Sequence, residues 1–217
     1  MNSVIKIQYS FGILFITVMF FTNGYAQKTF IESPGNYIFY RGVDNPFTIY
    51  STDNDCNSYF LSATNGEIHG KNCEYIYRPD KTGPAEIHFN KITGSDTVLT
   101  DTKTCRVREL PLPTARVAGL NEGVISKNVL LSQPGVSCSI ENFTLDIGVK
   151  VTGFRVMILK NNELVFTGYS EDNRFDDKIK YEFKLMKPGD TLYIVSIKAV
   201  LPNGQETMTN SIELKIR

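Results

Sequence analysis

Two prolines near the middle of the chain, Pro111 and Pro113, most constrain what this sequence can fold into. Proline has a fixed φ and no backbone N–H, and it pushes the preceding residue toward an extended conformation. Neither a helix nor a central strand therefore runs through this point. Residues 106–119 are two β-like segments on either side of Pro111, Leu112 and Pro113, which predicts a short, stiff seam between two β domains. A stiff seam fixes the angle between domains, which favours a structural or assembly role.

Residues 1–26 have the pattern of an export signal. Lys6 is their only charged residue, an apolar run covers residues 11–21, and Gly24 and Ala26 place small residues where a signal peptidase reads. The run is shorter than the roughly 20 apolar residues that a membrane-spanning helix needs. We therefore predict a cleavable signal peptide and a periplasmic or secreted mature protein. The alternative is an uncleaved signal that anchors the chain in the inner membrane.

The remainder of the chain predicts two consecutive β-sandwich domains of immunoglobulin-like type, at residues 27–110 and 111–217, in an all-β protein. Roughly 190 residues suit one large or two small domains. The 23 basic and 23 acidic residues balance, and without a basic face the chain has no signature of nucleic-acid binding. The chain contains no tryptophan, so the buried tryptophan of antibody domains is absent.

The first half alternates short apolar or aromatic runs with turn residues. Asn65 and Gly66 predict a hairpin turn with positive φ. Most of the aromatic side chains are expected in the core, although Phe39 and Tyr40 must point to opposite faces of their strand. An exposed tyrosine face would serve as a partner surface or a sugar platform. The predicted strands of this half cover residues 37–40, 46–50, 59–63, 73–78, 85–90 and 97–108.

The second half predicts strands and one short helix. Apolar residues at helical spacing predict the helix over residues 176–186. Hairpin turns are expected at residues 161–162 and 202–204, where asparagine and glycine favour positive φ. The main predicted strands cover residues 151–159, 164–168, 191–201 and 206–216.

Four cysteines fit an oxidising compartment. Cys56 and Cys73 flank a candidate strand pair, and we favour a bridge between them. Cys105 lies at the edge of the seam and Cys138 in the second half, so these two either bridge the domains or remain free thiols. Four cysteines allow three pairings, and the sequence does not choose among them.

Nothing in the sequence assembles a catalytic or metal site. His69 and His88 are the only histidines, and neither lies in a metal-spacing motif. Residues 53–55 resemble part of a calcium loop without its glycine and distal glutamate, which favours a solvated turn. The acidic pairs at 171–172 and 176–177 suit the start of a helix. We expect no enzyme activity, cofactor, metal or small-molecule substrate.

Several matches in one order resemble the last two domains of the GldM family of gliding-motility and type IX secretion proteins. Residues 40–50, 63–68 and 78–85 resemble its third domain. The second half resembles its fourth, C-terminal domain in the seam prolines and at residues 123–127, 135–136, 141–146, 188–189, 197–199 and 202–204. Leu112 departs from the family, which favours an acidic residue between the prolines.

The resemblance implies a non-enzymatic periplasmic protein of the secretion and gliding shaft. It implies a homodimer that contacts components on the outer-membrane side. In the family a membrane helix joins the inner-membrane motor, whereas this chain begins with a predicted signal peptide. The alternative function is a secreted or periplasmic binding module, either an adhesin or a glycan binder, with exposed aromatic rings in a groove.

Overall fold

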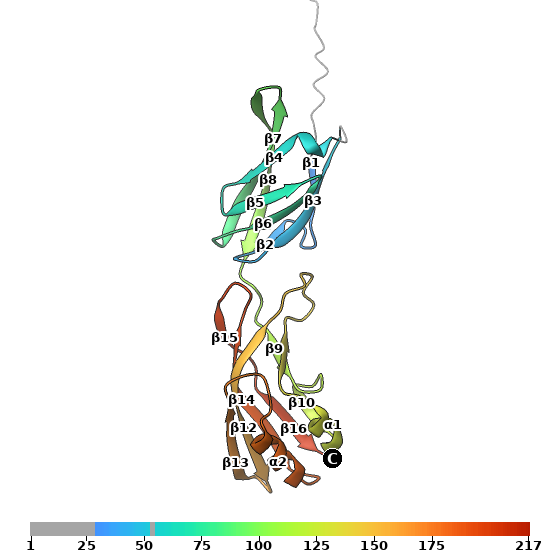
Figure 1. Ribbon diagram of the computed structural model, residues 1–217, viewed down its shortest axis with the longest axis vertical. Helices are drawn as coiled ribbons and strands as arrows, with labels where there is room; N and C mark the ends of the chain where they lie inside the picture. The colour runs from blue at the N-terminus through green and yellow to red at the C-terminus, as the bar shows by residue number, and fades with distance from the viewer. Residues whose placement is uncertain (1–28, 53–54) are drawn as a thin grey trace, which may run out of the picture.

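The computed structural model describes residues 29–52 and 55–217, so the predicted signal peptide lies outside the described residues. Two β domains follow one another along the long axis of the molecule (Figure 1), and each has its own hydrophobic core. The all-β class predicted from the sequence is confirmed. Among the described residues, no helix combines the length and apolar character that crossing a membrane requires.

The first domain is a sandwich of two four-stranded sheets. One sheet has the order β1-β3-β6-β5 and the other the order β2-β8-β7-β4. Strand β2 runs parallel to β8, and the other neighbours are antiparallel. The elements are β1 (Thr29–Glu32), β2 (Ile38–Tyr40), β3 (Asn45–Ser51), the 3-10 helix η1 (Cys56–Ser58), β4 (Tyr59–Ala63), β5 (Glu67–Lys71), β6 (Glu74–Arg78), β7 (Gly83–Thr93) and β8 (Asp96–Arg108).

Period-two alternation builds the core between these sheets. In β7, Ala85, Ile87 and Phe89 point inward and are almost completely buried, while their neighbours face solvent. Tyr77 comes from the opposite sheet, and its hydroxyl donates to the Asn65 carbonyl at 2.6 Å. The alternation in the sequence therefore identifies the inward face, because successive strand residues point to opposite faces.

The segment at Asn65 and Gly66 is not the predicted hairpin turn. Gly66 has positive φ, +80°, but β4 and β5 on either side belong to different sheets. The Asn65 Oδ1 accepts the backbone N–H groups of Asp80 and Lys81, and its Nδ2 donates to the Lys81 carbonyl at 2.6 Å. The segment is a corner between sheets. Asn-Gly does not distinguish a corner from a hairpin, because both use the same backbone conformation.

The second domain has one large mixed sheet. Its order is β10-β16-β14-β12-β13, with β15 paired to β14, and β9 and β11 form a separate two-stranded sheet. Strand β10 runs parallel to β16. The strands are β9 (Thr114–Arg116), β10 (Glu122–Ile125), β11 (Ser137–Ser139), β12 (Lys150–Lys160), β13 (Glu163–Ser170), β14 (Thr191–Val200), β15 (Glu206–Met208) and β16 (Ile212–Ile216).

Helices cover much of one face of this large sheet. The helices are α1 (Lys127–Ser132) and α2 (Asp177–Leu185), which contact each other. Leu130 of α1 and Phe183 of α2 join Val156 and Ile194 of the sheet in one core. Strand β9 contributes to the same core, so the second layer consists of two helices and two short strands.

Helix α2 is the helix that the sequence predicted over residues 176–186. Asp176 caps it, because its Oδ1 accepts the Ile179 N–H at 2.7 Å. Ile179, Phe183 and Met186 are all buried in the core. The structure adds α1, which the sequence did not predict. It has six residues and is capped by Ser126.

Both predicted hairpin turns of this domain are present. Asn161 and Asn162 have φ of +51° and +65° between β12 and β13. Gly204, with φ of +81°, lies between β14 and β15. These are the positive φ values that two-residue and glycine-containing turns require.

The strand predicted over residues 206–216 is interrupted. Strand β15 ends at Met208 and β16 begins at Ile212. Between them Asn210 bonds to β9, since its Oδ1 accepts the Ala115 N–H at 2.8 Å and its Nδ2 donates to the Ala115 carbonyl at 3.2 Å. A contact with a residue 95 positions away ends the strand, so no local pattern predicts the break.

Candidate functional site

The joint between the domains is a small hydrophobic core of its own. Val43 of the first domain, Leu110 of the seam and Leu201 of the second domain are buried together. Tyr40 and Phe143 pack edge-to-face, with ring centroids 4.7 Å apart. Further side chains from the loop between β11 and β12 pack against this cluster: Ile140, Leu145, Ile147 and Val149. We call this cluster the joint core.

Polar contacts surround the joint core. The Arg41 Nε donates to Glu109 Oε1 at 2.8 Å, and the Arg41 N–H donates to the Arg108 carbonyl at 2.9 Å. Gly42 has φ of +71°, and a Cβ there would lie 2.9 Å from the Asn203 Cβ. Glycine is therefore required where the first domain approaches the turn between β14 and β15.

The seam residues contribute unequally to this joint. Residues 109–113 form neither helix nor strand between β8 and β9. Pro113 is buried, whereas Pro111 and Leu112 are exposed, and Leu112 is 71% exposed. Leu110 is 6% exposed. Leu110, which the proline pattern did not single out, is thus the seam residue that packs in the joint core.

We expect Leu110→Ala to loosen the joint and Leu112→Ala to leave it unchanged. Removing a buried leucine side chain costs about 2–5 kcal/mol, whereas an exposed substitution changes stability by less than about 0.5 kcal/mol. Small-angle scattering should show a broader distribution of interdomain distances for Leu110→Ala only. Equal scattering profiles for the two variants would contradict the role of Leu110 in holding the domains in place.

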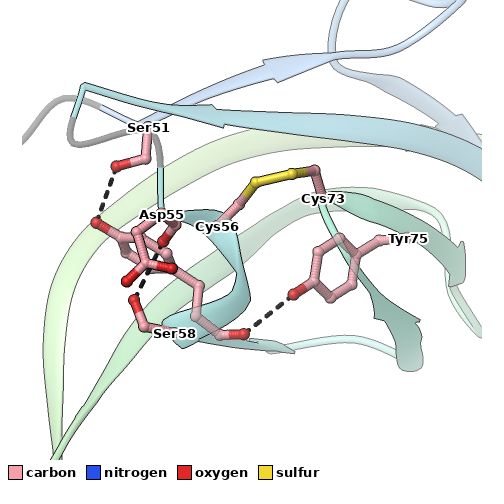
Figure 2. The surroundings of a disulfide bond; sticks show 7 residues. Ser51, Asp55, Cys56, Ser58, Cys73 and Tyr75 are labelled. Carbon is pink, nitrogen blue, oxygen red and sulfur yellow. Dashed lines mark hydrogen bonds between the residues drawn. A yellow bond between two sulfur atoms is a disulfide. The ribbon is translucent and has the colours of Figure 1, made fainter.

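The structure holds a disulfide between Cys56 and Cys73, with Cα atoms 5.3 Å apart. Cys56 precedes β4 and Cys73 precedes β6, so the bond links the two sheets of the first domain. Figure 2 shows Tyr75 beside it, whose hydroxyl donates to the Tyr59 carbonyl at 3.0 Å. The disulfide and this hydrogen bond therefore both join the two sheets of the sandwich, since Tyr75 lies in β6 and Tyr59 in β4.

Cys105 and Cys138 are free thiols, so the interdomain bridge that the sequence left open is absent. Cys105 belongs to β8 and is buried in the core of the first domain, and Cys138 packs against the core of the second. Burial raises the pKa of each thiol to about 11. Both side chains therefore remain protonated at neutral pH, which makes them poor nucleophiles.

The two histidines lie on different sheets of the first domain. His69 contacts Glu67 at 3.1 Å on β5, and the His88 Nδ1 lies 3.2 Å from the Thr102 Oγ1 on the other sheet. Within residues 29–52 and 55–217, no cluster of three or more metal-ligating side chains occurs. Residues 53–54 of the calcium-like segment lie outside the described residues.

A hollow with a volume of about 790 Å³ lies on the outer face of the β1-β3-β6-β5 sheet. Its two aromatic residues, Phe47 and Tyr75, are buried in the sandwich core. Phe30 and Tyr50 are half-exposed cross-strand neighbours on the same sheet, but they do not line the hollow. The remaining lining includes Glu32, Pro34, Pro46, His69, Lys71, Glu74 and Ile76.

Comparison with known families identifies the second domain. Residues 111–217 match the family described as the GldM C-terminal domain. The second domain belongs to the GldM family. This match relates the chain to the type IX secretion and gliding machinery. A search of curated proteins found no match.

Two solved structures each match a stretch that spans both domains of this GldM-related chain. One contains three N-terminal domains of the bacteriophage RB49 outer capsid protein Hoc, with 10% identity, 88% of this chain and 70% of that chain covered, and a TM-score of 0.28. The other contains tandem Ig repeats of Dlar, with 12% identity, 88% and 99% coverage, and a TM-score of 0.25. At these TM-scores neither structure carries an argument about this chain.

Proposed function

We propose that this chain is a non-enzymatic periplasmic protein related to the type IX secretion and gliding shaft, and that it acts through protein–protein contacts. The match of residues 111–217 to the GldM C-terminal domain is the observation that carries this proposal. The buried joint core supports it, because a part that transmits position needs a fixed angle between its domains.

We further propose that the whole chain, and not only its second domain, follows the family. Residues 27–110 correspond to the third domain of the family, and the signal peptide at residues 1–26 is removed on export. The mature chain forms a homodimer and contacts components on the outer-membrane side. It works at the far end of the shaft, because the two domains that it resembles are the last two of the family.

The alternative function, a glycan-binding module, is not favoured by the hollow on the first domain. A glycan platform needs exposed rings, whereas the rings that line this hollow, Phe47 and Tyr75, are buried. We therefore retain protein–protein contact as the proposed mode of action.

Crosslinking in living cells tests this function. We expect a tagged full chain to recover envelope proteins of the secretion or gliding machinery after crosslinking. The matched control lacks residues 1–26, stays in the cytoplasm and should lose those partners. Recovery of no envelope secretion or gliding protein by the exported chain would contradict the proposed function.

A further inference from the structure

Strand β13 forms one edge of the large sheet in the second domain. It pairs with β12 on one side, and within the described part of the chain no strand pairs with its other side. At eight residues, it is twice the length of β10 at the opposite edge. An unpaired edge presents a row of backbone N–H and C=O groups that another extended chain can pair with.

The edge lacks the charges that usually protect such strands. The only charged side chain of β13 is Glu163, the first residue of the strand. Leu164, Val165 and Tyr169 are 54%, 50% and 61% exposed. By contrast, the edge strand β5 carries glutamate, histidine and lysine within five residues. Charged residues on an edge discourage pairing, so β13 is the more receptive of these two edges.

Helix α2 contacts β13 and lies beside it (Figure 1). The Lys178 Nζ lies 5.9 Å from the centroid of the Phe166 ring on β13. Tyr181 and Leu185 follow Lys178 at three and seven positions, on the same side of the helix, and are 57% and 43% exposed. The exposed apolar stripe of α2 therefore runs along the side of the helix that carries Lys178.

A glycine allows the helix to approach the strand closely. A Cβ at Gly168 would lie 2.8 Å from the Phe166 ring and 3.3 Å from the Ile179 Cγ1 of α2. The core side of β13 is therefore filled by the Phe166 ring and by α2. The unpaired edge lies between this helix and Tyr169, which points to the opposite face of the sheet and stacks under the Arg155 guanidinium at 4.8 Å.

Acidic groups gather where β13 ends and α2 begins. A hollow of about 580 Å³ is lined there by four carboxylates and one guanidinium. Asp172 and Asp176 accept backbone N–H groups, so they also hold the turn and the helix cap in place. The excess negative charge favours a basic group on whatever binds next to it. The charged residues that line this hollow are Glu171, Asp172, Arg174, Asp176 and Asp177.

We propose that the β13 edge and the adjoining α2 stripe bind an extended segment of a partner protein, which adds to the sheet as a further strand. Backbone pairing supplies the affinity, and alternate apolar side chains of the segment pack on both faces. On one face they contact Tyr169 and Leu164, which lie on the same side because the pairing of β12 and β13 shifts by one residue between Leu164 and Phe166. On the other face they contact Tyr181 and Leu185. A lysine or arginine of the segment lies against the acidic hollow. The inference rests on the proposed function, since it names the kind of partner segment that the second domain takes.

Amide hydrogen exchange on the full chain tests this site. The probes are two synthetic peptides of alternating valine and threonine, with two lysines at the N-terminal or the C-terminal end. We expect one of them to slow exchange in β13 by about tenfold or more near saturation. Tyr181→Glu should weaken binding by about tenfold, since it removes an apolar contact. Val129→Glu is the matched control, because Val129 is an exposed residue of α1, and should bind normally.

A second probe leaves the protein unaltered. N-methylation of alternate amides on the peptide edge that faces β13 should abolish binding, because it removes the pairing N–H groups, whereas replacement of the lysines by glutamates should weaken it. Unchanged binding of the methylated peptide, or no slowed exchange in β13 with either lysine peptide, would overturn the proposal. Protection of β13 that rises with protein concentration alone would also overturn it, in favour of a second copy. Neither result depends on the crosslinking in cells, so failure of the site and failure of the proposed function are distinguishable.

Discussion

Replacing Phe183 with alanine is expected to lower the free energy of unfolding of the second domain by about 3–5 kcal/mol. Phe183 is fully buried, and its ring packs edge-to-face on Phe175 at 5.0 Å between centroids. The variant leaves a cavity where α2 meets the sheet, and it removes an aromatic contact as well as buried area. Thermal unfolding followed by circular dichroism should show a fall of at least about 10 °C in the transition of this domain.

Tyr181→Ala provides the matched control on the same helix. Tyr181 is 57% exposed, so its loss should change stability by less than about 1 kcal/mol. A similar loss of stability in the two variants would contradict the prediction that burial of Phe183 in the core determines the effect. The first-domain transition should be unchanged by either substitution, since Phe183 and the first-domain core belong to separate clusters.

Removing the disulfide, as Cys56→Ala with Cys73→Ala, is expected to destabilise the first domain by about 3 kcal/mol. The bond closes a loop with a sequence separation of 17 and links the two sheets. Without it the unfolded chain gains conformational freedom, so the folded state becomes relatively less favourable. Guanidinium unfolding of the double variant and of the parent protein measures the difference.

Reducing agent distinguishes the bond from the loss of the two side chains. Dithiothreitol should destabilise the parent protein by about the same amount and leave the double variant unchanged. Cys138→Ala, which removes a free thiol, should retain the full sensitivity to dithiothreitol. A parent protein that unfolds at the same guanidinium concentration with and without reductant would contradict the prediction.

Much of the fold was predictable because its signals are local. The alternation in β7 and β12 and the asparagine turn at Asn161 and Asn162 depend on residues next to one another in sequence. Helix α2 combines an aspartate cap with apolar residues at helical spacing, and its predicted range agrees with the structure. These signals act over one turn or one strand, so the sequence contains all of the information that they need.

The elements that the sequence did not predict have weak local patterns. Strand β1 has four residues, and β5 is mostly exposed, so neither shows a long apolar alternation. Helix α1 has six residues, too few for periodicity to separate it from a turn. Neighbouring strands supply the backbone partners that define β1 and β5, and those partners lie far away in sequence.

The candidate sites were predicted only in part. The prolines indicated where the domains meet, but the joint core depends on Leu110, Val43 and Leu201, which come from three separate parts of the chain. The sequence likewise identified a strand near residues 164–168, but not that it is an edge. Edge position follows from the order of strands in the sheet, which local patterns do not contain.

The sequence by itself determined the β class, the two-part organisation around the prolines, the principal turns and helix α2. It also contained the resemblance to the GldM C-terminal domain that the family match bears out. The tertiary structure alone decided the packing of the joint, the corner at Asn65 and the open edge of β13 beside α2. The physical reason is range: propensity and periodicity act between near neighbours, whereas packing and strand order join residues that are distant along the chain.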